Sequence, residues 1–317
     1  MRRDKWTDTP VPWDEPAGKN PPDGAIIDYW LPPGVTGAVQ IRILNDRSDF
    51  VRTFSSDDVL PGPDSTANIP LGWVRPPQRL SAEPGPHRFV WDLRYPPPPA
   101  TQHGYPIGAI WGDTPREPRG VWAVPGAYRL QLLVNGRTYE EQLTVRMDPR
   151  VKTPPADLAT QFAAGTRIVE MWRRDSTAIA SVQAMRAQVD SLKKAAGAGP
   201  RADSLAAFDE KLVALLSGGG AGGRRAVAPP PAGPAPAAPA PTAPAAGGRS
   251  PTIFPQSNLM RLSGELGGLY GTVQGNDSAP TSQVAVAFLG YQRQLEQLLG
   301  RWDSLRREGQ GLGVMGR

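Results

Sequence analysis

The first half of the chain alternates hydrophobic and polar residues, which is the period of β-strands. The most distinctive run is 87–94, in which Phe89, Trp91 and Leu93 share one face. Similar short runs occur at 25–31, 39–44, 50–54, 126–132 and 138–145. The dipeptide Asn135–Gly136 predicts a tight hairpin, because both central residues of a type I′ turn need positive φ. About seven short strands joined by turns indicate a small antiparallel β-sandwich over residues 24–148.

After this region the hydrophobic residues recur at helical spacing. One long helix is predicted from about Leu158 to Ala196, with Asp175 among its polar positions, and a second follows from Asp203 to Leu215. Leu259 to Val273 and Val284 to Leu305 then step by three and four, the pattern of seams between short antiparallel helices. The predicted fold class is therefore α+β with two domains, a β-sandwich followed by an antiparallel bundle of three or four helices.

Two segments have the composition of extended chain rather than of helix or sheet. Residues 1–23 hold five prolines around Trp6 and Trp13, and proline removes backbone donors. Residues 218–250 are almost entirely Gly, Ala and Pro, which favours a polyproline-like spacer. The expected parts are an arm (1–23), the sandwich (24–148), a helical hairpin (149–217), a linker (218–250) and a hairpin that completes the bundle (251–317).

Two long insertions, 55–85 and 95–125, interrupt the predicted sandwich, and loops of this length are often functional or mobile. Tryptophans lie in or beside both, and a bare surface tryptophan is costly, so we expect these loops to pack back on the sandwich or on a partner. The candidate partner-binding residues are the tryptophans of the arm and loops and the arginines near the linker ends, namely Trp6, Trp13, Trp73, Trp111, Trp122, Arg224, Arg225 and Arg249.

The composition removes much catalytic chemistry. The chain has no cysteine, which excludes disulfides, thiolate zinc sites, iron–sulfur clusters and cysteine nucleophiles. Two histidines, His87 and His103, are too few for a multi-histidine metal site. Adjacent acids such as Glu140 and Glu141 point to opposite faces of a strand, so they do not form a glycosidase pair. The glycines from Gly218 follow a helix and lack the Lys-Ser/Thr of a phosphate loop. We expect no enzyme and no catalytic, cofactor or metal site.

Charge is distributed unevenly along the sequence. Residues 1–150 hold 17 basic and 18 acidic side chains, whereas 151–317 hold 18 and 12. An acidic protein face or an anionic membrane surface is therefore expected to meet the C-terminal half. The basic residues are mixed with acids and lack an aromatic ladder, which argues against nucleic acid. With no hydrophobic leader at the N-terminus and no long apolar run, we expect a cytoplasmic chain, either free or peripheral to a membrane.

Several runs resemble a known protein family. They are Pro22–Tyr29, Val51–Ser55, His87–Tyr95, Asp113–Pro115, Pro125–Tyr128 and Asp148–Val151. The sequence of these runs is similar to the C-terminal region of bacterial sortilin-like BNR-repeat proteins, which are often labelled glycosyl hydrolases. The propeller that precedes this region in the family is missing here, because no Ser-x-Asp-x-Gly-x-x-Trp repeat occurs. The resemblance implies an immunoglobulin- or fibronectin-III-like module with a helical hairpin, in an accessory role and with no catalytic residue carried over.

The leading hypothesis is a non-enzymatic structural subunit whose arm and linker lie across protein partners in a larger assembly. The host implied by resemblance is a bacterial photosynthetic reaction-centre–antenna complex, to which the chain would bind as a membrane-extrinsic subunit. The alternative is an accessory module of a sortilin-like protein, exported in its parent context, that binds carbohydrate or peptide through the aromatic loops. A third possibility is an orphan glycosidase.

Overall fold

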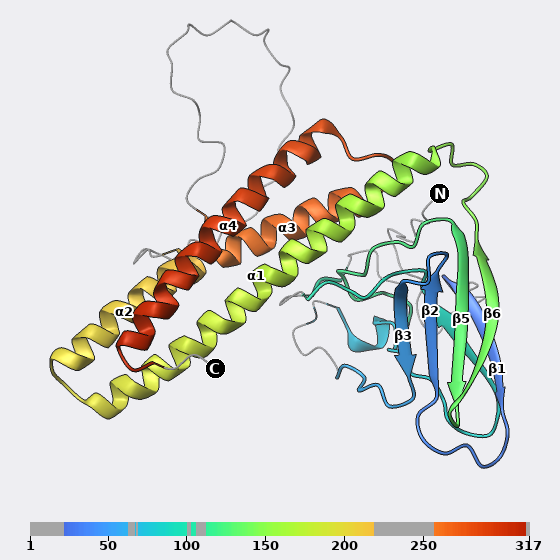
Figure 1. The fold of residues 1–317 in the computed structure, drawn as a ribbon, viewed down its shortest axis with the longest axis horizontal. Coiled ribbons are helices and arrows are strands. Elements are labelled where there is room, and N and C mark those ends of the chain that lie inside the picture. The colour runs from blue at the N-terminus through green and yellow to red at the C-terminus, as the bar shows by residue number, and fades with distance from the viewer. Residues whose placement is uncertain are drawn as a thin grey trace, which may run out of the picture. The chain divides into compact units, whose positions relative to one another are not determined.

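The computed structural model describes residues 22–62, 67, 69–99, 103–105, 112–218 and 257–314. Within these residues the chain is α+β, with two antiparallel sheets in the N-terminal half and four helices in the C-terminal half (Figure 1). The predicted fold class is confirmed at this level. Six strands are present in the described part, one fewer than the approximate number expected from the alternation.

The strands form one small and one larger sheet. The small sheet pairs β1 (Ala25–Leu31) with β4 (Gly85–Trp91). The larger sheet has the order β3-β2-β5-β6, built from β3 (Phe50–Ser55), β2 (Gln40–Asn45), β5 (Gly126–Val134) and β6 (Arg137–Val145). The predicted Asn135–Gly136 hairpin joins β5 to β6, and the two residues have φ of 49° and 74°.

Side chains from both sheets share one hydrophobic core. Trp91 is fully buried and packs edge-to-face on Tyr128 of the other sheet, with ring centroids 5.4 Å apart. Phe54 and Phe89 form a second contact between the sheets, at 4.6 Å. Because aromatic residues bury large apolar areas and add edge-to-face attraction, these pairs contribute strongly to the packing of one sheet on the other.

The strand that carries Trp91 is shorter than predicted. The sequence extends it to Arg94, but β4 ends at Trp91 and Leu93 has a φ of 56°. The backbone turns here because Arg94 leaves the sheet to form an isolated bridge with Trp122, while the Trp91 indole N–H donates to the Arg94 carbonyl at 3.0 Å. The end of β4 is thereby directed into the second of the long loops.

The described parts of the two long loops contact each other. A short 3-10 helix, η1 (Leu71–Trp73), is followed by a bridge between Val74 and Thr114. Next to this bridge the Arg75 Nε donates to Asp113 Oδ1 at 2.8 Å. These contacts join the two insertions to each other; the expectation that the insertions pack on the sandwich or on a partner stays a prediction.

The four helices follow the predicted periodicity closely. They are α1 (Pro155–Ala196), α2 (Pro200–Ser217), α3 (Leu259–Gln274) and α4 (Ser282–Gly311). α2 begins three residues earlier than predicted, with Pro200 in the first turn, where its missing N–H is no loss. No helix in the described ranges is long and apolar enough to span a bilayer.

The chain divides into two compact units whose boundaries fall inside helices. Unit 1 comprises residues 1–177 and 263–295, and unit 2 comprises 178–262 and 296–317. The buried hydrophobic residues of unit 2 come from all four helices and include Val182, Leu212, Leu262 and Leu298. Ion pairs at 2.8 Å (Arg186 with Asp209) and 2.6 Å (Lys211 with Glu308) join helices within this unit.

Candidate functional site

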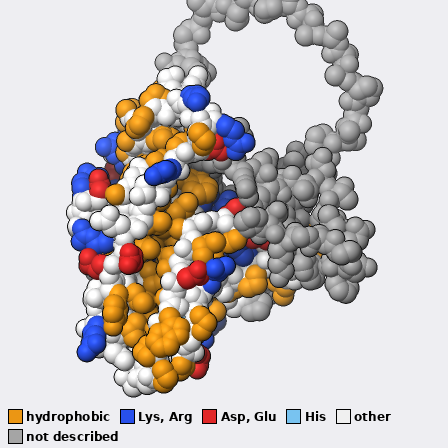
Figure 2. All heavy atoms as spheres, turned by 90° about the vertical axis from the view of Figure 1, so that its right-hand side faces the viewer, with side chains coloured by type: hydrophobic (Ala, Val, Ile, Leu, Met, Phe, Trp, Pro, Cys, Tyr) orange, Lys and Arg blue, Asp and Glu red, His pale blue; other side chains and the backbone are white. Residues whose placement is uncertain are grey.

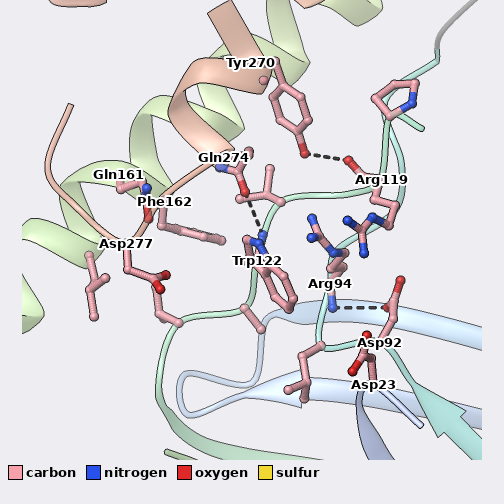
Figure 3. Close-up of a pocket in the computed structure, with 18 of the residues that line it drawn as sticks. Asp23, Asp92, Arg94, Arg119, Trp122, Gln161, Phe162, Tyr270, Gln274 and Asp277 are labelled. Atoms are coloured by element: carbon pink, nitrogen blue, oxygen red, sulfur yellow. Dashed lines mark hydrogen bonds between the residues drawn. The ribbon is translucent and has the colours of Figure 1, made fainter. Parts of the chain in front are cut away.

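A cleft of about 1000 Å³ lies in unit 1, where the loop from residue 117 to 125 meets α1 and α3 (Figure 3). Its hydrophobic wall is formed by aromatic side chains from the loop and from both helices, namely Trp122, Phe162, Trp172 and Tyr270. Charged groups line the same cleft, namely Asp23, Asp92, Arg94, Glu117, Arg119, Arg146, Asp148 and Asp277. A cleft that combines apolar walls with convergent polar groups is the usual form of a ligand site.

Hydrogen bonds from the helices hold the loop in place. The Trp122 backbone N–H donates to Gln274 Oε1 at 3.1 Å, and the Tyr270 hydroxyl donates to the Arg119 carbonyl at 2.7 Å (Figure 3). The buried Gln161 of α1 donates to the carbonyls of Val273 and Asn276, at 2.7 and 2.6 Å. A side chain of α1 therefore binds backbone carbonyls at the end of α3, and side chains of α3 bind the backbone of the loop. These bonds join α1, α3 and the loop into one fixed wall.

Two glycines permit the close packing around this wall. A Cβ at Gly165 of α1 would lie 2.6 Å from the Gln274 side-chain nitrogen, and one at Gly120 would lie 1.7 Å from the Tyr95 carbonyl oxygen. Distances this short are not compatible with a larger side chain unless the neighbour moves. The position of Gln274 and the path of the loop both depend on these two residues.

Arg94 is the most unusual group in the cleft. Its side chain is buried, with 5% of the residue exposed, and its Nη1 donates to the Gly120 carbonyl at 2.8 Å. The guanidinium carbon lies 3.7 Å from the centroid of the Trp122 ring. Nε is buried and has no hydrogen-bond partner among the described residues. Burial, reinforced by the positive charge of Arg119, lowers the pKa of Arg94 to about 9.

Several carboxylates around the cleft pair with other arginines. Glu117 binds Arg119 at 2.8 Å and Asp92 binds Arg52 at 3.4 Å. The Asp92 carboxylate also accepts the backbone N–H of Arg94, at 3.3 Å (Figure 3). These carboxylates act as anchors for arginine side chains and loops.

Asp148 is held in the same way, by Arg150 at 2.6 Å. Hydrogen bonds from the side chain and backbone of Arg150 lower the pKa of Asp148 well below its usual range. A carboxylate this strongly stabilised in its ionised form is poorly suited to take up a proton in general acid–base catalysis.

Both histidines make local backbone contacts. His87 Nε2 lies 2.6 Å from the Glu83 carbonyl oxygen and its ring packs against Tyr29, with centroids 5.1 Å apart. His103 Nδ1 lies 3.2 Å from the Glu117 carbonyl oxygen. No group of three or more metal-ligating side chains occurs in the described ranges.

The candidate partner-binding residues of the sequence are only partly visible in the structure. Six of them lie outside the described residues, namely Trp6, Trp13, Trp111, Arg224, Arg225 and Arg249. Trp73 is half-buried in η1, and Trp122 is half-buried with Arg94 over its ring. Of the candidates that are described, the cleft contains Trp122 alone.

The sequence did not single out Arg94, Gln161, Tyr270 or Gln274, although all four line the cleft. Their partners are distant along the chain, since the Trp122–Gln274 bond joins positions 152 residues apart. The pairing of Trp122 with Arg94 at the end of β4 also joins positions well separated along the chain. A single sequence contains no periodic signal for such contacts, so they emerge only in the folded chain.

Asp175 of α1 is a second unusual group. The helical pattern placed it among the polar positions between the hydrophobic ones, yet the residue is fully buried and both carboxylate oxygens lack a hydrogen-bond partner in the described part of the chain. Burial raises its pKa to about 7, and the nearby Ser263 hydroxyl partly offsets the shift. That hydroxyl accepts the Trp172 indole N–H at 2.9 Å.

Large hydrophobic side chains are also exposed on strands. On β1, Ile26 is 48% and Trp30 is 62% exposed, and between them Asp28 forms an ion pair at 2.8 Å with Arg88 of β4. Figure 2 is viewed from the side on which β1 and β6 are drawn in Figure 1, and on the described residues it shows hydrophobic patches between charged side chains. The edge strand of the other sheet, β3, carries Phe50, which is 64% exposed.

Comparison with known proteins found no matching family model, no matching curated protein and no matching solved structure. The geometry described above is therefore the basis for assigning a function.

Proposed function

We propose that this chain is a non-enzymatic structural subunit that binds other proteins and holds them in a larger assembly, and that β1 is its principal partner-binding surface. The observation that carries the proposal is Trp30, a tryptophan whose side chain stands largely exposed on a regular strand. Tryptophan is enriched among the residues that dominate protein interfaces. A partner that covered the exposed part of Trp30 would remove roughly 100–150 Å² of apolar surface from water, equivalent to about 3 kcal/mol.

The edge of β1 supports the same conclusion. In the described ranges β1 pairs with β4 alone, so alternate backbone groups along its other edge have no strand partner. The free edge of β4 is different, because the Val90 N–H donates there to Gln78. An exposed strand edge is a template for an added strand, with side chains such as Trp30 and Ile26 giving further contacts. The proposed partner therefore contributes an extended segment that pairs with β1.

The chemistry of the cleft supports a binding role rather than turnover. Glu117, Asp92 and Asp148 are each paired with an arginine, and His87 and His103 are not among the residues that line the cleft. We further propose that the two sheets form an immunoglobulin- or fibronectin-III-like sandwich and that the helices form a bundle. The relationship to sortilin-like proteins, and a photosynthetic reaction-centre–antenna complex as the host assembly, remain predictions from the sequence.

The test is purification of the tagged full-length chain from its native cells under mild detergent, with mass spectrometry of co-purifying proteins. We expect stoichiometric partners with the wild type and at least a tenfold lower recovery with Ile26→Ala/Trp30→Ala, because a hot-spot tryptophan is worth 2 kcal/mol or more, about 30-fold in affinity. Phe50→Ala is the matched control, since it removes an equally exposed aromatic from an edge strand of the other sheet.

Recovery of the wild type as a lone monomer would refute the proposal. Equal recovery of partners by the double variant and by Phe50→Ala would show that β1 is not the binding surface. Substrate turnover by the purified chain, abolished by replacing one acidic or imidazole side chain, would show that the chain is an enzyme.

A further inference from the structure

The guanidinium of Arg94 is a buried cation that the protein leaves incompletely satisfied. An arginine side chain has five N–H donors, and among the described residues the Arg94 side chain has one acceptor, the backbone carbonyl of Gly120. Nε is buried without a partner. An unsatisfied buried donor costs free energy, and an acceptor supplied from outside the chain would remove this cost.

No carboxylate of the described residues forms an ion pair with the Arg94 guanidinium. The nearby Glu117 and Asp92 attract its charge and so raise its pKa, but they pair directly with Arg119 and Arg52, and burial outweighs their effect. Arg119 lies close enough for its charge to lower the pKa of Arg94 further. An anion placed beside Arg94 would interact in a partly dry cleft, where attraction between charges is stronger than in water.

The remainder of the cleft is suited to a hydrophobic ligand body. Its walls include Trp122, Phe162, Trp172 and Tyr270, and its volume of about 1000 Å³ accommodates a molecule of the size of a few amino-acid residues. Arg94 lines the cleft together with these rings, so a ligand with a charged end and an apolar body would satisfy both (Figure 3). Arginine is particularly suited to carboxylates because its planar donors match the two oxygens.

We propose that the cleft of unit 1 binds a terminal carboxylate attached to an aromatic or aliphatic body, with Arg94 as the anion-binding residue. The source of this group is either a free carboxylic acid or the C-terminus of a peptide, which share this chemistry. The site is distinct from the β1 surface, since neither Trp30 nor Ile26 lines the cleft.

The experiment compares ligands that differ in charge and hardly at all in shape. N-acetylphenylalanine and its primary amide represent the free acid, and an acetylated Ala-Ala-Ala-Phe peptide with a free or amidated C-terminus represents the peptide. Binding to the full-length chain is measured by isothermal titration calorimetry, and the Trp122 indole resonance is followed by NMR. We expect at least one acid to bind about tenfold or more tightly than its amide and to shift that resonance, because hydrogen bonds to charged groups are worth 1.5 kcal/mol or more.

The tighter of the two acids identifies the source of the carboxylate. Arg94→Met removes the charge and the donors at similar length, and we expect it to bind acid and amide equally. Arg42→Met is the control, because Arg42 lies on β2 outside the cleft. If Arg94→Met does not fold, as judged by near-UV circular dichroism, Arg94→Lys replaces it and should retain a reduced preference for the acid.

Three results would overturn the proposal: no binding of either acid at millimolar concentration, equal binding of acid and amide by the wild type, or an unchanged preference for the acid in the folded Arg94 variant. If neither variant folds, equal binding of acid and amide by the wild type still overturns the proposal. None of these outcomes depends on the β1 surface, so the two proposals fail separately.

Discussion

Asp175 offers the sharpest prediction about stability. The folded chain buries this carboxyl completely and raises its pKa from 3.8 to about 7. Below about pH 4 the side chain is protonated in both the folded and the unfolded chain, and it makes no pH-dependent contribution. Between about pH 4 and 7 the unfolded chain loses the proton while the folded chain retains it, so the folded state becomes less stable as pH rises.

The size of this effect follows from the shift. Each pH unit in that window costs about 1.4 kcal/mol, so about 4 kcal/mol of stability is lost by pH 8 compared with pH 4. Asp175→Asn replaces the carboxyl by a neutral group of nearly the same shape. We expect the variant to be close to the wild type near pH 4 and more stable by up to about 4 kcal/mol at pH 8, because the amide does not ionise.

The measurement is urea unfolding of wild type and variant at half-unit steps from pH 4 to 8, followed by tryptophan fluorescence. Asp190→Asn is the control, since Asp190 lies on the same helix with an exposed side chain paired to Lys194. A constant difference between Asp175→Asn and wild type across this pH range would refute the reasoning. The pH dependence of the difference is the diagnostic quantity, because any cost of burying the amide is the same at every pH.

Three further substitutions test the core and the wall of the cleft. Trp91→Ala should lower the free energy of unfolding in urea by about 3–5 kcal/mol, because the side chain is fully buried. Trp30→Ala, at an exposed position, should lower it by less than about 1 kcal/mol. Equal losses for the two variants would contradict the shared core. Gly120→Ala should lower the melting temperature clearly more than Gly126→Ala does. The new Cβ at position 120 would meet the Tyr95 carbonyl, whereas open space surrounds Gly126. Similar melting temperatures for the two variants would argue against this loop path. Gln274→Leu should lower the free energy of unfolding by about 1–3 kcal/mol, because it leaves the Trp122 amide without its acceptor. The Trp122 amide should then exchange its hydrogen rapidly with solvent. Retained protection of this amide would contradict the prediction.

The order and type of most elements could be predicted from the sequence. The alternation of hydrophobic and polar residues predicted β1 to β6 close to their observed bounds. Hydrophobic residues spaced three and four apart predicted the four helices. The β5–β6 turn was predicted because Asn135–Gly136 meets a local requirement for positive φ. These features depend on residues that are close along the chain, and their spacing can be read directly from the sequence.

Other features were decided by tertiary structure alone. The end of β4 at Trp91 and the burial of Arg94 both depend on the distant Trp122 segment, which the helical residues Tyr270 and Gln274 hold in place. Asp175 has the sequence context of a surface residue, yet it is buried because the helix face that bears it is covered in the fold. Contacts between positions that are distant in the sequence leave no periodic trace in one sequence, so the cleft and its buried charge exist only once unit 1 has folded.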